Sequence, residues 1–159
     1  MQKQKLNGEM TVSWPDEFRV MSESEMNRMY PNDAGKSWGI QGGEPNITMT
    51  CVWWTKNRIL MWLADLKTSI KSLEMKTRKA YAGHEYHLDG FFSTTVADLK
   101  AEGLRFTFTD SGKIVQVETL IVKTDKCYYT FSCIARKELA EKMHAAFEAL
   151  LSSAVVETA

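Results

Sequence analysis

The most constraining feature of the sequence is a series of four strand-like segments joined by links too short for a crossover. They cover residues 91–96, 104–108, 114–122 and 127–135. Asp110–Gly112 joins the second segment to the third, and Thr124–Lys126 joins the third to the fourth. Links of this length connect antiparallel strands, whereas parallel strands need a crossover of about a dozen residues. An antiparallel sheet is therefore the predicted centre of the fold.

Two amphipathic helices are predicted to pack on this sheet. Each has apolar side chains at three- and four-residue steps, and Asn57 is a suitable N-cap for the first helix. The two stripes are Ile59, Trp62, Leu63, Leu66, Ile70 and Leu73, and Leu139, Met143, Ala146, Phe147, Leu150 and Leu151. A strand over residues 47–54 becomes apolar on both faces, which is typical of a strand covered on both sides. We therefore predict an α+β fold, a three-layer α/β/α sandwich around a mainly antiparallel sheet.

The N-terminal third carries shorter signals. Glu9–Trp14 alternates like a strand and stops at a proline, and Phe18–Met21 is a candidate return strand. Ser22–Glu25 has a capping-box pattern that predicts a helix to about Tyr30. Residues 31–43 contain four glycines and are expected to form a loop. At 159 residues we expect one domain over 9–153, with a disordered or extended start over 1–8 and a frayed tail over 154–159.

Charge and cysteine content narrow the classes of function. The 20 Lys and Arg equal the 20 Asp and Glu, which argues against nucleic acid or anionic membrane as the partner. No apolar run approaches the roughly 20 residues of a membrane span, and no signal-peptide pattern is visible at the start. Cys51, Cys127 and Cys133 each lie in an apolar run without a C-x-x-C pair. We expect buried thiols in a cytoplasmic protein.

The motifs that suggest catalysis or metal binding lack the required context. Gly35–Gly39 fits the G-x-S-x-G pattern of hydrolases, but turn residues flank it where a strand and a helix are needed. His84 and His87 are three residues apart, so on a strand they point to opposite faces and cannot easily share a metal ion. We expect neither a metal nor a cofactor, and no enzymatic activity.

The basic character of the first predicted helix has two interpretations. Residues 56–79 contain seven Lys and Arg against two Asp and Glu. The simpler interpretation is a solvated helix face whose lysines lie toward the C-terminal end, where the helix dipole favours them. The alternative is a docking surface for an acidic partner.

Tryptophan is frequent, with five in the chain. Trp53 and Trp54 are adjacent in a predicted strand and should face opposite layers. Trp14 and Trp38 have no periodic reason to be buried, since one precedes a proline and the other lies in the glycine-rich segment. Each is either a lid over the edge of the core or an anchor for a partner.

The order of elements resembles that of the PsbP-like superfamily. The resemblance rests on a first strand that ends in Trp14–Phe18, on Tyr128–Ser132 running into a terminal helix that ends near Leu151–Ser153, and on the segments Gly90–Thr95 and Ala101–Gly103. It is closest to small uncharacterised bacterial members. It implies a three-layer α/β/α sandwich and a non-catalytic binding or assembly role, as in an extrinsic photosystem subunit and in a nuclear-import factor that binds a small GTPase.

These observations predict a protein-interaction or assembly module, with a protein as partner and neither nucleic acid nor membrane. The alternative is a small-ligand-binding protein or enzyme with a pocket at the sheet edge. The candidate binding residues are Trp38, Trp14, Trp54, Tyr86 and His87.

Overall fold

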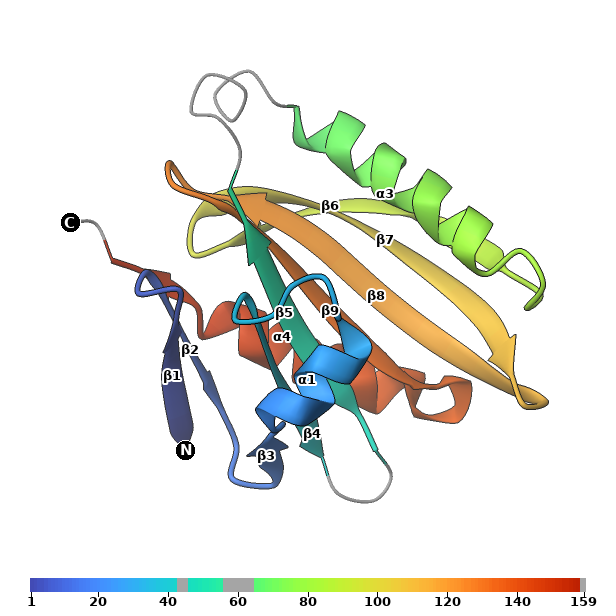
Figure 1. The fold of residues 1–159 in the computed structure, drawn as a ribbon, viewed down its shortest axis with the longest axis horizontal. Helices are drawn as coiled ribbons and strands as arrows, with labels where there is room; N and C mark the ends of the chain where they lie inside the picture. The colour runs from blue at the N-terminus through green and yellow to red at the C-terminus, as the bar shows by residue number, and fades with distance from the viewer. Residues whose placement is uncertain (43–45, 56–64, 158–159) are drawn as a thin grey trace.

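The computed structural model describes residues 1–42, 46–55 and 65–157. These residues form two antiparallel sheets and three α-helices (Figure 1). The helices are α1 (Glu23–Met29), α3 (Leu66–Ala80) and α4 (Ala140–Ser152), the last preceded by the 3-10 turn η1 (Lys137–Leu139). The predicted α+β sandwich is confirmed.

The larger sheet has seven strands in the order β3-β4-β5-β9-β8-β7-β6, and every neighbouring pair is antiparallel. The strands are β3 (Phe18–Val20), β4 (Ser37–Gly42), β5 (Thr48–Trp54), β6 (His87–Val96), β7 (Leu99–Asp110), β8 (Lys113–Lys123) and β9 (Tyr128–Arg136). Both predicted hairpins are confirmed. The β7–β8 turn places Ser111 and Gly112 at positive φ, as a two-residue hairpin turn requires.

The smaller sheet joins the two ends of the described chain. Its strands are β1 (Gln2–Leu6), β2 (Met10–Trp14) and β10 (Val155–Val156), in the order β1-β2-β10. Residues 2–6, predicted to be disordered or extended, thus pair with β2. The tail predicted to fray over 154–159 instead contributes β10 to the other edge of β2. Partners that are distant in the sequence leave no local pattern, which is why the sequence did not show this sheet.

Two predictions for the N-terminal third are wrong. Phe18–Val20 does not return along β2 but pairs with β4, with Phe18 opposite Gly42. The segment over residues 31–43, predicted to be a loop, contains β4, which pairs with β3 on one side and with β5 on the other. Glycine is needed in β4 because neighbouring side chains approach closely: a Cβ at Gly39 would lie 2.9 Å from the Met26 sulfur, and one at Gly42 would lie 2.8 Å from the Phe18 ring.

The helices begin where local capping dictates. Ser22 caps α1, and its hydroxyl and the Glu25 carboxylate each accept a backbone N–H in the predicted capping box. Asp65 caps α3 by accepting the Lys67 N–H at 3.1 Å. The predicted cap Asn57 and the first three residues of the predicted stripe (Ile59, Trp62 and Leu63) lie outside the described residues. The predicted stripe of α4 is confirmed by its buried residues, which are Met143, Phe147, Leu150 and Leu151.

The two faces of the seven-stranded sheet are covered differently (Figure 1). On the face that we call the closed face, α4 and the three-stranded sheet enclose a large apolar cluster that includes Trp14, Phe131 and Phe147. On the opposite face, which we call the open face, α3 packs on β7 and β8 and α1 packs on β4. Ile70 of α3 and Leu104 of β7 belong to the smaller apolar cluster of this face. On the open face, α1 and α3 lie apart from each other (Figure 1).

Candidate functional site

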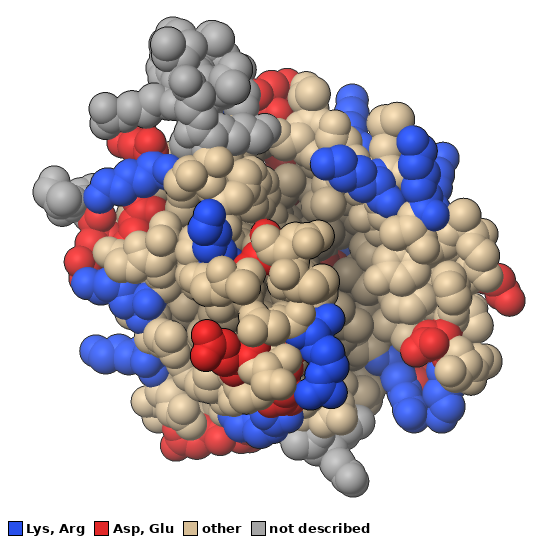
Figure 2. Space-filling model, viewed as in Figure 1, with Lys and Arg blue, Asp and Glu red and all other residues tan. Residues whose placement is uncertain are grey.

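A cleft of about 410 Å³ lies on the open face between α1 and α3. The space-filling view is hollowed between these two helices (Figure 2). The floor consists of side chains from β5, β9, β8 and β7, and the walls come from α3 and from the segment that follows α1. The lining residues are Tyr30, Asp33, Val52, Trp54, Leu73, Lys76, Thr77, Tyr81, Phe106, Val117, Thr119, Thr130, Ser132 and Ile134.

A row of hydroxyl groups crosses the sheet in and beside the floor. Thr50, Ser132 and Thr119 are direct cross-strand neighbours on β5, β9 and β8. The Tyr30 hydroxyl lies 2.8 Å from Thr50 Oγ1, and Ser132 Oγ lies 2.8 Å from Thr119 Oγ1. Threonine and serine suit paired strands because their hydroxyls can bond across the ladder. The sequence therefore places a polar strip on a sheet whose other face is apolar.

Thr119 and Ser132 share a hydrogen bond in the floor. Thr119 Oγ1 also lies 3.1 Å from the Phe131 carbonyl oxygen, which can only accept. In the contact between the two hydroxyls either oxygen can be the donor. Ser132 is half-buried. Its remaining lone pairs can accept a hydrogen bond from a molecule in the cleft.

Two aromatic rings that line the cleft, one from the floor and one from the end of α3, are held in place by stacking. The Trp54 ring stacks on Tyr128 with centroids 5.2 Å apart, and Tyr81 stacks on Phe108 at 4.2 Å. Burial raises the pKa of Tyr30, against the opposing effect of its hydrogen bond to Thr50, and burial also raises the pKa of Tyr81. Both phenols are therefore neutral at physiological pH.

The charged lining residues are one acid and one base. Among the described residues that line the cleft, Asp33 is the only carboxylate and Lys76 the only ammonium. Lys76 comes from α3, and Asp33 from the turn after α1 that is closed by its N–H bond to the Tyr30 carbonyl. The cleft therefore presents charges of opposite sign from opposite walls.

Two of the residues predicted to bind a partner lie in the core. The prediction of a loop position for Trp38 is wrong: it lies in β4 and is 4% exposed. Trp14 ends β2 and is 2% exposed, and the two rings pack at 5.1 Å on the closed face. Neither indole N–H has a hydrogen-bond partner among the described residues. Their size and pairing make them part of the core, away from the cleft.

The other three predicted residues are separated from one another. Trp54 lines the cleft. Tyr86 donates a 2.7 Å hydrogen bond to Glu74, and burial together with this bond raises the pKa of Tyr86. His87 is exposed, with its Nε2 3.5 Å from Asp89. The structure does not bring the five predicted residues into one site.

Three buried carboxylates were not singled out from the sequence. Glu74 binds Arg78 through two hydrogen bonds. Burial raises its pKa, but the bonds from Tyr86 and Arg78 outweigh this and hold the pKa below its usual value. Glu118 contacts Arg105 at 2.6 Å and His144 at 3.0 Å. Glu9 accepts bonds from the Thr124 and Tyr129 hydroxyls at 2.9 and 2.7 Å.

These carboxylates act as structural ties between elements. Each carboxylate forms hydrogen bonds with other side chains of the protein. No group of three or more potential metal ligands occurs in the part of the chain that the structure describes. Their burial comes from long-range packing, so spacing in the sequence carries no sign of it.

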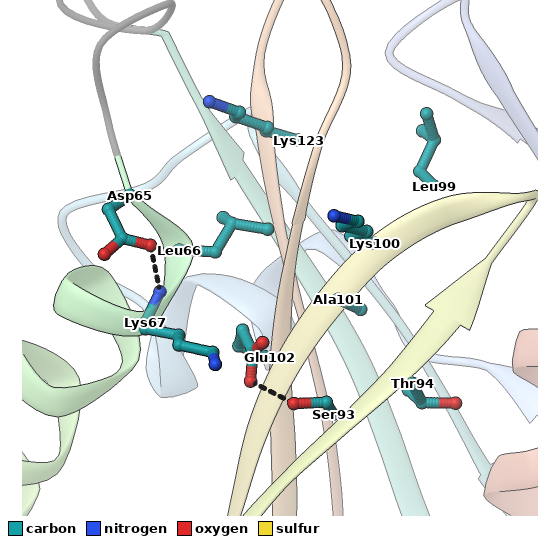
Figure 3. A pocket seen from close by; sticks show the side chains of 10 residues that line it. All are labelled: Asp65, Leu66, Lys67, Ser93, Thr94, Leu99, Lys100, Ala101, Glu102 and Lys123. Carbon is teal, nitrogen blue, oxygen red and sulfur yellow. Dashed lines mark hydrogen bonds between the residues drawn. The ribbon is translucent and has the colours of Figure 1, made fainter.

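A second cavity, of about 610 Å³, lies at the N-terminal end of α3 (Figure 3). Its lining is rich in charge, with lysines from α3, β7 and β8. The Glu102 carboxylate accepts a 2.7 Å bond from Ser93, and Lys67 extends toward Glu102. Ligand pockets are usually lined by apolar and aromatic groups with a few polar ones. The cleft between α1 and α3 fits that description better and is the candidate site.

The architecture defines an α+β sandwich in which a long antiparallel sheet carries helices on both faces. Comparison with solved structures identifies this fold as PsbP-like. Cyanobacterial PsbP (CyanoP) from Synechocystis sp. PCC 6803 matches with a TM-score of 0.73 and 10% identity, over 98% of this chain and 92% of that one. No protein-family model matches the sequence, and no curated protein does.

Two further solved structures have similar folds. LpqN, involved in cell envelope biogenesis of Mycobacterium tuberculosis, matches with a TM-score of 0.62 and 15% identity over 94% of this chain and 83% of that one. A protein of unknown function from Pseudomonas aeruginosa matches with a TM-score of 0.62 and 8% identity over 100% and 99%. None of the three is described as an enzyme. No helix in the described residues is long and apolar enough to cross a membrane.

Proposed function

We propose that this protein is a non-catalytic binding module that recognises a partner protein through the cleft between α1 and α3. The observation that carries the proposal is the unequal covering of the sheet. The closed face is sealed by α4 and the three-stranded sheet, whereas β5, β9 and β8 are left partly uncovered on the open face. A hydroxyl strip beside aromatic rings combines a few placed polar groups with apolar contact area, which is what a recognition surface needs.

A second candidate function is the binding of a small molecule in the same cleft. The volume of about 410 Å³ is in the range of ligand pockets. The exposed part of the Trp54 ring, held in place by its stack on Tyr128, offers a surface for a planar group. The two candidates share a site and differ in the size of the ligand.

The proposal is tested by filling the cleft. Thr130 is half-buried in the floor, so Thr130→Trp should occupy the space, whereas Thr95→Trp places the same ring on exposed β6. Immobilised wild-type and Thr95→Trp protein should retain the same partners from a lysate, and Thr130→Trp should lose them. Equal retention by all three would show that the cleft is not the recognition site.

A thermal-shift screen with a metabolite library separates the two candidates. A ligand at a hundred times its dissociation constant stabilises the fold by about 3 kcal/mol. A metabolite that stabilises wild-type protein but not Thr130→Trp would favour the small-molecule function. We also propose a cytoplasmic location, supported by three buried free thiols.

A further inference from the structure

We propose that the cleft binds an extended segment of about four residues of the partner polypeptide, which carries a basic side chain for Asp33 and an acidic side chain for Lys76. This inference rests on the proposed function and specifies its ligand. Three features of the cleft support it: its length, its pair of opposite charges and its acceptor at Ser132.

The length of the cleft fits a short extended peptide. Its α3 wall includes residues from Leu73 to Tyr81. At a rise of 1.5 Å per residue these eight steps span about 12 Å. An extended chain advances about 3.3 Å per residue, so about four residues fill this distance.

The charges define which side chains such a segment needs. Asp33 and Lys76 face the cleft from opposite walls, and the rest of the described lining is neutral. A ligand of one charge would gain from one wall and be repelled by the other. A segment with one basic and one acidic side chain complements both, and such complementarity selects partners and fixes their orientation.

The floor offers a hydrogen-bond acceptor. Ser132 Oγ bonds to Thr119 and keeps lone pairs that can accept a further hydrogen bond. Every residue of an extended peptide other than proline carries a backbone N–H. A segment that crosses the floor can therefore donate a backbone N–H to Ser132 while its side chains reach the two walls.

The test uses blocked hexapeptides as probes, labelled with a dye and acetylated and amidated at their ends. The peptides vary at two positions that are three residues apart. Four sets are compared, with lysine and glutamate, lysine and glutamine, glutamine and glutamate, or glutamine and glutamine at these positions. Fluorescence polarisation measures their affinity for wild-type protein. We expect the set with both charges to bind most tightly, by about fivefold for each charge, as for partly exposed ion pairs.

Single substitutions assign each charge to its wall. Asp33→Asn should abolish the preference for lysine over glutamine and keep the preference for glutamate. Lys76→Met should do the opposite. Lys79→Met, on the exposed side of α3 and outside the cleft lining, should change neither preference.

The outcomes separate this inference from the proposed function. If Thr130→Trp abolishes peptide binding but neither charge matters, the cleft binds peptides and the charge assignment is wrong. If no peptide binding responds to Thr130→Trp, the peptide inference fails, whereas the proposed function fails only if Thr130→Trp also retains the same partners as the wild-type protein. If a free amino acid binds in a Thr130→Trp-sensitive manner while no blocked peptide does, the ligand is a small zwitterion and the peptide proposal is overturned.

Discussion

The two faces of one sheet have opposite characters in this protein, and β9 shows how one strand provides both. Tyr129, Phe131 and Cys133 point to the closed face and are fully buried. Thr130 and Ser132, which alternate with them, line the cleft on the open face. Because side chains of a strand alternate between faces, a single segment can serve a core and a recognition surface at once. We infer that the closed face supplies stability and the open face supplies specificity.

The largest expected effect concerns the thiols, all three of which lie on the closed face. Burial raises the pKa of each of them. Each should react with a thiol reagent roughly a thousandfold more slowly than a free cysteine, because labelling requires that face to open. Mass spectrometry after timed labelling checks this, with denatured protein as the control that takes up three labels. Labelling of the native protein within minutes would show that the closed face is not sealed.

Truncating one side chain on each face compares their contributions to stability. Phe147→Ala on α4 removes a ring that is 2% exposed on the closed face and should lower the free energy of unfolding by about 3–5 kcal/mol. Ser132→Ala in the cleft should cost less than about 1 kcal/mol, because Thr119 keeps its bond to the Phe131 carbonyl. Urea unfolding measures both, and exposed Lys142→Ala is the control for α4. Equal losses for Phe147 and Ser132 would contradict the division between the faces.

Replacing one glycine on each face by alanine tests how rigid the side-chain packing around it is. A Cβ at Gly103 would meet the Phe92 ring at all three of its nearest atoms, whereas at Gly39 two of the three nearest atoms are the flexible thioethers of Met26 and Met21 and the third is the Thr50 methyl group. A ring cannot bend away and thioethers can, so Gly103→Ala should cost about 1–3 kcal/mol and Gly39→Ala less. Thermal unfolding checks the order. In the Phe92→Ala background the cost of Gly103→Ala should largely disappear, and a cost that persists would mean that the ring is not its cause.

The smallest effect is a pH dependence at the open face. Hydrogen bonds from the Arg19 guanidinium and the Ser22 N–H lower the pKa of Glu25 to about 2. Since the unfolded chain has the ordinary value near 4.3, the folded state favours the ionised carboxylate. The contribution of Glu25 to the stability of the folded state is present above about pH 4 and is lost as the pH falls toward 2.

The Glu25 effect can be isolated by substitution. Glu25→Gln should reduce the fall in melting temperature between pH 5 and pH 2. The matched control is Glu23→Gln in the same helical turn, which should leave the fall as it is in the unaltered protein. If both variants behave alike, the pH dependence does not come from Glu25.

Most of the fold could be predicted from local sequence patterns, whereas the site is formed by tertiary contacts. The hairpins, the capping box at Ser22 and the stripe of α4 depend on neighbours in the sequence and were predictable. The strand β4 was missed because Gly39 and Gly42 resemble loop residues, although they are glycine to admit Met26 and Phe18. For the same reason, Trp38 was assigned to a loop, as a lid over the core or an anchor for a partner.

The cleft could not be predicted because its residues lie in several elements. Thr119 and Ser132 look like ordinary strand residues, and only the separation of α1 from α3 makes them a floor. The distance between α1 and α3 depends on which strands the two helices cover. The spacing of residues in the sequence does not indicate which strands these are. Trp54 was the one predicted binding residue that the structure places in the cleft.

The small sheet has a consequence for the order in which the protein can be completed during synthesis. Ser13 on β2 bonds to Ser153, 140 positions later, and β10 pairs with β2 just beyond. At roughly 5–20 residues per second, β2 waits about 7–28 s for these partners. A chain interrupted before residue 150 would leave the edge of β2 unpaired and apolar side chains of the closed face uncovered. Chaperones and proteases recognise such surfaces, so the closed face is protected only once the last turn of α4 and β10 have been added.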